Sequence, residues 1–69
     1  MQKDLRINYA AARINKGLTQ KEAAKALGIS EWTLINYESG KTIPTWDRHN
    51  KMADFYEIPK EVLCSPKKS

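Results

Sequence analysis

The chain has 69 residues, of which 41% are hydrophobic, so it is long enough for one small domain with a modest core. Its single cysteine excludes an internal disulfide, no apolar run is long enough to span a membrane, and its first residues are too polar for a signal peptide. The formal net charge of +4 favours a polyanionic partner, and cytoplasm is the expected compartment.

The first predicted helix begins after Asp4, which is a suitable N-cap, and runs to about Asn15, where Gly17 ends it. Tyr9 and Ala12 share one face of this helix and are expected to face the core. No stretch of the chain shows the alternation of apolar and polar residues that is typical of a strand. We therefore predict an all-α fold without a sheet.

Residues 20–37 predict two short helices joined by a tight turn. Thr19 is a good N-cap for the first of them, and Glu22, three residues later, completes a capping box. Gly28 suits the left-handed position that ends this helix, and Ser30 caps the next one. Two short helices around a glycine turn, the second with an adaptable outer face, are typical of a helix-turn-helix unit.

The second helix of this unit has an inward and an outward face. Leu34 and Tyr37, three residues apart, are expected to face the core. The outward face is predicted to present four residues: Glu31, Trp32, Ile35 and Asn36.

Two further helices are predicted after Gly40, which ends the third helix. Thr45 caps a fourth helix over residues 46–56. Pro59 is placed to begin a short fifth helix, in which Leu63 and its neighbour Val62 close the core. The inward residues of the fourth helix are expected to be Trp46, His49, Met52, Ala53 and Tyr56.

The domain is expected to cover residues 4–64, and residues 65–69 are expected to form a polar tail. The residues 5–63 resemble the XRE-like family of phage repressor and Cro-type helix-turn-helix proteins. The resemblance lies in a joint pattern of Arg13, Gly17, Leu18, Thr19, Gln20, Ala24, Leu27, Gly28, Ile29, Ser30, Thr33, Leu34, Glu38, Ser39, Gly40, Lys41, Pro44, Ala53, Ile58, Val62 and Leu63.

This resemblance implies a five-helix, lambda-repressor-like domain that binds double-stranded DNA in a sequence-specific way. A small repressor or Cro-like transcriptional regulator is the simplest member of that class. Such a protein binds a two-fold related operator as a homodimer, at least when it is on DNA. The implied location is the nucleoid in the cytoplasm of a bacterial or phage-infected host cell.

The resemblance also implies a role for individual residues. Arg13 and Glu38 match a pair that forms a partly buried salt bridge between the first and third helices. Glu31, Trp32 and Asn36 match positions that reach base edges. The positions implied to contact DNA phosphates, by the resemblance and by the two helix N-termini, are Thr19, Gln20, Ser30, Thr33, Ser39, Lys41 and Thr42.

The chemistry of the outward residues leaves alternatives open. The amide of Asn36 can bond both N6 and N7 of adenine, and Glu31 either accepts from cytosine N4 or only complements the positive helix N-terminus. Ile35 either contacts a thymine methyl group or is a scattered surface residue. Trp32 either packs on DNA or anchors a protein interface.

An enzyme is not expected, and neither is a cofactor, a metal or a small-molecule ligand. His49 has no second histidine or cysteine cluster beside it, so a structural role is favoured over metal binding. Cys64 lacks a suitable histidine partner and is expected to be a passive thiol. The alternative function is a protein-interaction module with weak DNA binding, such as an antirepressor or an antitoxin-like partner.

Overall fold

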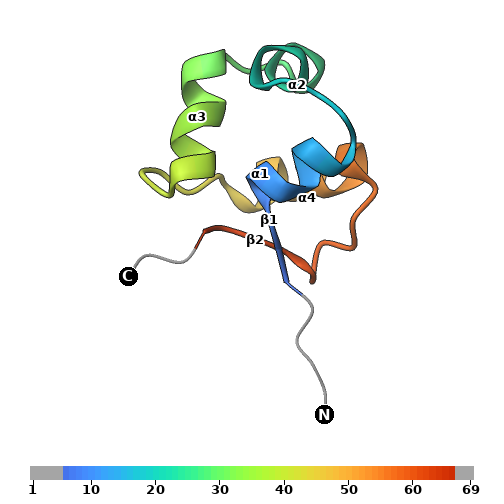
Figure 1. Ribbon diagram of the computed structural model, residues 1–69. Helices are drawn as coiled ribbons and strands as arrows, with labels where there is room; N and C mark the ends of the chain where they lie inside the picture. Colours follow the sequence, from blue (N-terminus) through green and yellow to red (C-terminus); the bar gives the residue numbers. More distant parts are fainter. Residues whose placement is uncertain (1–5, 67–69) are drawn as a thin grey trace.

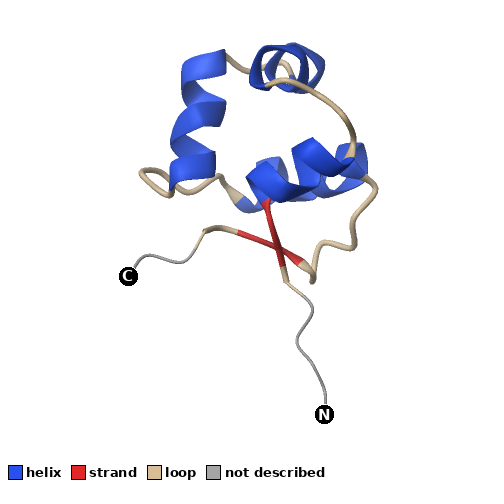
Figure 2. Ribbon diagram, in the orientation of Figure 1, coloured by secondary structure: helices blue, strands red, loops and turns tan. Residues whose placement is uncertain are grey.

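The computed structural model describes residues 6–66 of the chain. Most of this range is helical, and a small sheet joins its two ends (Figures 1 and 2). The elements in chain order are β1 (Ile7–Asn8), α1 (Tyr9–Asn15), α2 (Gln20–Leu27), α3 (Glu31–Ser39), α4 (Trp46–Tyr56) and β2 (Leu63–Cys64). The helix-turn-helix fold is thus confirmed, but the described residues form four helices and not the five predicted.

The first helix begins later than predicted. Asp4 lies outside the described residues, and α1 starts at Tyr9, where the side chain of Asn8 accepts a 2.8 Å hydrogen bond from the backbone N–H of Ala11. The residues just before Tyr9 are extended because they pair with β2. The predicted end of the helix is confirmed, since Gly17 follows α1 in the left-handed region with φ of 81°.

The prediction of no sheet was wrong. β1 and β2 pair in parallel, with Ile7 opposite Leu63 and Asn8 opposite Cys64. The backbone N–H of Ile7 also donates to the carbonyl of Val62 at 2.9 Å. Strands of two residues are too short to show an alternating pattern, and their pairing depends on contacts between the two ends of the domain.

The prediction of a fifth helix beginning at Pro59 was also wrong. The carbonyl of Pro59 accepts hydrogen bonds from the N–H groups of Val62 and Leu63, at 2.9 and 3.1 Å, which closes a single turn. The chain then extends into β2 because Leu63 pairs with Ile7. Residues 67–69 of the predicted tail lie outside the described part of the chain.

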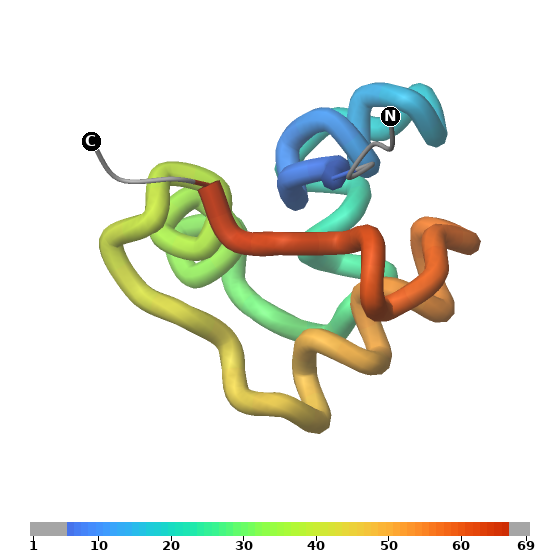
Figure 3. The backbone as a smooth tube through the Cα atoms, turned by 90° about the horizontal axis from the view of Figure 1, so that it is seen from below, coloured from blue at the N-terminus to red at the C-terminus, as the bar shows by residue number. Residues whose placement is uncertain are grey.

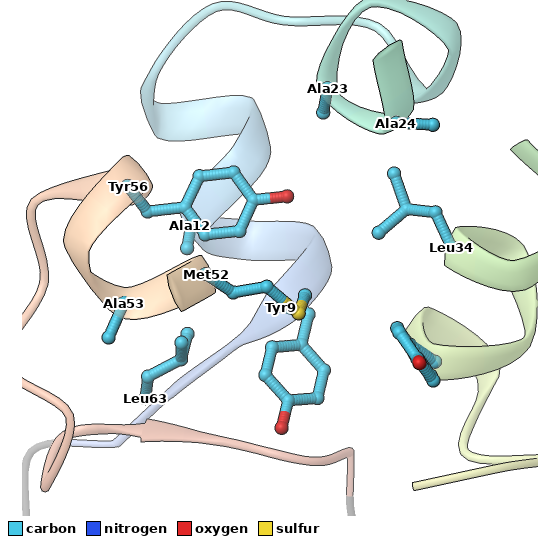
Figure 4. Packing of buried hydrophobic residues seen from close by; sticks show 10 residues of the cluster. Tyr9, Ala12, Ala23, Ala24, Leu34, Met52, Ala53, Tyr56 and Leu63 are labelled. Atoms are coloured by element: carbon cyan, nitrogen blue, oxygen red, sulfur yellow. The ribbon is translucent and has the colours of Figure 1, made fainter. Parts of the chain in front are cut away.

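The core lies where the four helices and β2 meet. Tyr9, Leu34 and Met52 are its largest fully buried side chains, and Figure 4 shows them reaching in from three different helices. The other buried hydrophobic residues are Ala12, Ala23, Ala24, Tyr37, Ala53, Tyr56 and Leu63. Trp46 was predicted to face inward, but it is 65% exposed at the first position of α4.

The C-terminal segment passes across the base of the molecule, as the view from below shows (Figure 3). It pairs with β1 at its start and reaches the end of α3 at Pro66. A Cβ atom added to Gly40 would lie 3.3 Å from Cγ of Pro66, so the C-terminal segment and the end of α3 approach each other closely there. This segment therefore links the start of α1 to the C-terminal end of α3.

Candidate nucleic-acid interface

The unit formed by α2, the turn and α3 is defined by its caps. Thr19 accepts a 3.1 Å hydrogen bond from the N–H of Glu22, whose carboxylate in turn accepts one from the N–H of Thr19 at 2.9 Å. Gly28 ends α2 in the left-handed region with φ of 75°, and the N–H of Ile29 returns to the carbonyl of Ala24 at 3.0 Å. The predicted capping box and glycine turn are both present.

The exposed face of α3 is more apolar than expected. Ser30 caps the helix by accepting from the N–H of Thr33 at 3.0 Å. Beyond this cap, Trp32 is 71% exposed and Ile35 is 39% exposed, while Glu31 is exposed at the N-terminal end. We call Glu31, Trp32 and Ile35 the exposed face of α3.

Asn36 does not belong to this face, so its predicted outward position was wrong. It is only 7% exposed, and Leu34 and Tyr37 beside it are also buried. At the end of α3, the N–H groups of Lys41 and Thr42 donate to the backbone carbonyl of Asn36 at 3.0 and 3.3 Å. The burial of the Asn36 side chain is not visible in the helical periodicity from which the face was assigned.

Arg13 and Glu38 are brought together as an ion pair between α1 and α3. Nε of Arg13 lies 2.7 Å from Oε2 of Glu38, and Nη2 donates to Oε1 at 3.2 Å. Both side chains are largely buried, at 13% and 6% exposed. The hydrogen bond to Glu38 raises the pKa of the Arg13 guanidinium. Its Nη1 also donates to the carbonyl of Leu18, so one side chain fixes α1, the following loop and α3.

Gln20 joins this cluster, which the sequence pattern did not indicate. Its Nε2 donates to Oε1 of Glu38 at 3.0 Å, so the side chain bridges the start of α2 and the end of α3. An amide nitrogen has two hydrogens, and the second remains for another acceptor. A phosphate bond from Gln20 is therefore compatible with the bridge, but its orientation is set by Glu38.

The other residues assigned to phosphates differ in how many of their polar atoms are in use. The hydroxyl groups of Ser30 and Thr33 lie 2.8 Å apart, and Ser39 donates to the carbonyl of Asn36 at 3.2 Å. Lys41 and Thr42 are exposed in the loop after α3. These two present the most accessible donors near the C-terminal end of α3.

A second connection holds α4 against α3. Nη1 of Arg48 donates to the hydroxyl of Tyr37 at 3.3 Å. The sequence pattern gave no signal for this contact, because an arginine near the start of a helix has many possible partners. Together with the Arg13–Glu38 pair, it anchors the C-terminal half of α3.

His49 has a structural role in the arrangement seen here. Its Nε2 lies 3.0 Å from the carbonyl of Lys60, and since a carbonyl only accepts, Nε2 carries the proton. Its Nδ1 shares a 2.9 Å hydrogen bond with the hydroxyl of Tyr9, and Trp46 stacks on the ring with centroids 5.8 Å apart. Both ring nitrogens are thus used to connect α4 with α1 and with the turn before β2.

Residues 6–66 contain no group of three or more histidine, cysteine or acidic side chains that could hold a metal ion. Among the same residues, no helix combines the length and the apolar character needed to cross a bilayer. Within the described part of the chain, the buried hydroxyl of Tyr56 in the core has no hydrogen-bond partner.

The geometry of α2, the turn and α3 is that of a helix-turn-helix unit, and a comparison of the sequence with models of protein families gives the same assignment. A model described as Helix-turn-helix matches residues 10–63, which is most of the chain. The chain belongs to the XRE-like, phage repressor and Cro-type helix-turn-helix family. The matched range begins within α1 and ends at the first residue of β2, so it includes all of α2, α3 and α4.

Two similar curated proteins are named as phage transcriptional repressors. The cryptic phage CTXphi transcriptional repressor RstR of Vibrio cholerae is 34% identical over 53 residues, which is 77% of this chain and 48% of that protein. The protein of the same name from the El Tor Inaba strain of serotype O1 is 43% identical over 51 residues, or 74% of this chain and 44% of its own length. The chain thus spans about half the length of these relatives. No solved structure matches it significantly.

Proposed function

We propose that this helix-turn-helix chain is a sequence-specific, double-stranded DNA-binding transcriptional regulator, most simply a small repressor or Cro-like protein. The observation that carries the proposal is the exposed face of α3, which the caps, the Gly28 turn and the Arg13–Glu38 pair hold in a fixed orientation. A helix presented in this way fits the major groove. The similarity to phage transcriptional repressors supports the same function.

In this proposal, base contacts come from Glu31, Trp32 and Ile35. Asn36 is left out because it is buried, with 7% of its surface exposed. Phosphate contacts come from polar groups around the two helix N-termini and from the loop after α3, since helix N-termini and lysines attract phosphate. The proposed set is Thr19, Gln20, Ser30, Thr33, Ser39, Lys41 and Thr42.

We further propose that two copies bind a two-fold related operator, with their α3 helices in successive major grooves about 34–36 Å apart. The DNA-binding domain covers residues 4–64, and it works without a cofactor or a small-molecule ligand. The protein acts in the cytoplasm of a bacterial or phage-infected cell, at the nucleoid. Neither binding nor regulation in this scheme requires enzymatic chemistry.

Selection from a pool of random duplex DNA, followed by sequencing of the bound fraction, tests this function. We expect a motif with two-fold symmetry to be enriched, with half-sites about one helical turn apart. A variant with Lys41→Ala should bind all sequences more weakly and should lower the salt dependence without changing the motif. A pool that shows no enriched motif would contradict the proposal.

The exposure of Trp32 also favours a second candidate, a protein-interaction module with weak DNA binding, such as an antirepressor or antitoxin-like partner. Tryptophan is enriched at the energetic centres of protein interfaces, and 71% exposure is unusual for this side chain. The two candidates differ in salt dependence. DNA binding weakens steeply as salt rises, whereas an apolar protein interface centred on Trp32 responds little.

A further inference from the structure

We infer that the exposed face of α3 recognises thymine methyl groups, with Trp32 and Ile35 each contacting the 5-methyl group of one thymine in the same half-site. The inference rests on the proposed function and specifies its substrate: operators with two nearby thymines in each half-site. It assigns the base preference to apolar contact, where an amide–adenine hydrogen bond was expected from the sequence.

The first step is the list of groups that α3 offers to a base edge. The residue Asn36 is only 7% exposed, and the hydroxyl of Ser39 donates to the carbonyl of Asn36. The exposed face therefore presents the carboxylate of Glu31 and the indole N–H of Trp32 beside two large apolar surfaces.

The second step is the chemistry of the major groove. Thymine is the base that presents a methyl group there, whereas cytosine presents an amino donor and adenine and guanine present polar atoms. An isoleucine side chain and the flat faces of an indole ring have no polar atom to pair with those groups, and only the indole N–H at the ring edge can donate to a base acceptor. Contact with a methyl group removes apolar surface from water on both partners.

The third step is spacing. Trp32 and Ile35 are three residues apart on α3, and side chains at that spacing lie on one side of a helix with Cβ atoms about 5–6 Å apart. Successive bases along one strand are separated by about 3.4 Å. The two side chains therefore match methyl groups that are one or two base steps apart.

Charge identifies DNA as the occupant of this apolar face. The chain has a formal net charge of +4, and Lys41 is exposed in the loop that follows α3. An apolar face on a positively charged chain suits a groove whose floor carries methyl groups and whose walls carry phosphates. The carboxylate of Glu31 adds a constraint on the base sequence of the half-site, because the base group from which it accepts a hydrogen bond is N4 of cytosine.

The test uses the full chain and the operator obtained by selection from the random pool. Each thymine of the operator is replaced in turn by uracil, which keeps the pairing and the O4 acceptor and removes only the methyl group. We expect affinity, measured by fluorescence anisotropy, to fall about fourfold at each of two positions per half-site, the factor for one buried methyl-sized group. Uracil at other positions should leave affinity unchanged.

Variants assign the two methyl groups to the two side chains. Trp32→Ala should abolish the difference between thymine and uracil at one position, and Ile35→Ala at the other. Trp46→Ala and Ile14→Ala are matched controls, since these side chains are 65% and 64% exposed on α4 and α1. Both controls should keep the full thymine preference.

The outcomes separate this inference from the proposed function. An operator that binds equally well with thymine and uracil throughout overturns the methyl contacts and leaves DNA binding intact. The same holds if Trp32→Ala weakens the thymine and uracil duplexes by equal factors. A pool without any enriched motif contradicts the proposed function itself, and salt-insensitive binding of a protein through Trp32 would replace DNA as the occupant.

Discussion

Arg13 and Glu38 form an ion pair with Nε and Oε2 2.7 Å apart, although 25 residues separate them in the chain. The pair connects α1 to the last turn of α3, and Gln20 adds the start of α2 to the same carboxylate. Both side chains of the pair are largely buried, so the loss of either charge would leave the other without its counter-charge in a place with little water. The orientation of α3 therefore depends on this cluster.

Replacing Arg13 by alanine should lower the free energy of unfolding by roughly 3–5 kcal/mol, because the carboxylate of Glu38 would remain buried without its counter-charge. Urea denaturation followed by circular dichroism measures this loss. The Lys16–Glu57 pair is a matched control: its charged atoms are 3.9 Å apart and Glu57 is 79% exposed. Lys16→Ala should cost at most about 1 kcal/mol, and equal losses for both variants would contradict the account.

Asn36→Ala should act on folding and leave base preference unchanged. The residue is only 7% exposed, so the removal of its side chain should cost about 1 kcal/mol or more of stability. Selection from random duplex DNA with the variant should return the same motif as the parent chain. A changed base pair in that motif, together with unchanged stability, would show that Asn36 turns outward on DNA.

Gly28→Ala should destabilise the domain by about 1 kcal/mol. A Cβ atom at this position would meet nothing within 4 Å, so the cost comes from the backbone alone, which has φ of 75°. Gly28→Asn should recover part of the loss, since asparagine tolerates the left-handed region better than alanine. Thermal unfolding of the parent chain and the two variants gives the order of their stabilities. A Gly28→Ala variant as stable as the parent chain would exclude conformational strain at the turn.

The alkaline stability of the domain should depend on Tyr56. Burial raises the pKa of its phenol from 10.0 to about 12, and its hydroxyl has no hydrogen-bond partner. A raised pKa in the folded state means that stability is fully present below pH 10 and is lost as pH rises from about 10 toward about 12.

Tyr56→Phe should remove this part of the alkaline loss and should be neutral or stabilising at pH 7, because it deletes an unpaired buried hydroxyl. Urea denaturation of both proteins across the alkaline range is the measurement. Tyr37→Phe is the control with a paired hydroxyl, since that group accepts from Arg48, and it should destabilise. A loss of stability at pH 7 on Tyr56→Phe would indicate that the hydroxyl has a partner.

The parts of the fold that local chemistry determines could be predicted from sequence. Thr19, Ser30 and Thr45 cap their helices, and Gly28 and Gly40 end theirs in the left-handed region. Each of these features depends on a few consecutive residues, whose side-chain and backbone preferences act within one turn. The bounds of the middle helices follow from them.

The parts that were missed depend on residues far apart in sequence. Ile7 is extended because it pairs with Leu63, which also prevents a helix after Pro59. Trp46 points outward and stacks on His49, a position that helical periodicity alone did not indicate. Asn36 is buried, although its helix position places it next to the outward residues. The four residues predicted to face outward do lie on α3, but packing in the folded domain buries one of them, Asn36.

The most direct test of the central claim is the affinity of the full chain for its selected operator and for a scrambled duplex of equal composition, each at two salt concentrations. Recognition by the exposed face of α3 predicts operator affinity at least about 10³-fold above that of the scrambled duplex, with both affinities falling as salt rises. Equal affinity for the two duplexes would contradict sequence recognition by α3, and binding that does not respond to salt would contradict DNA as the partner.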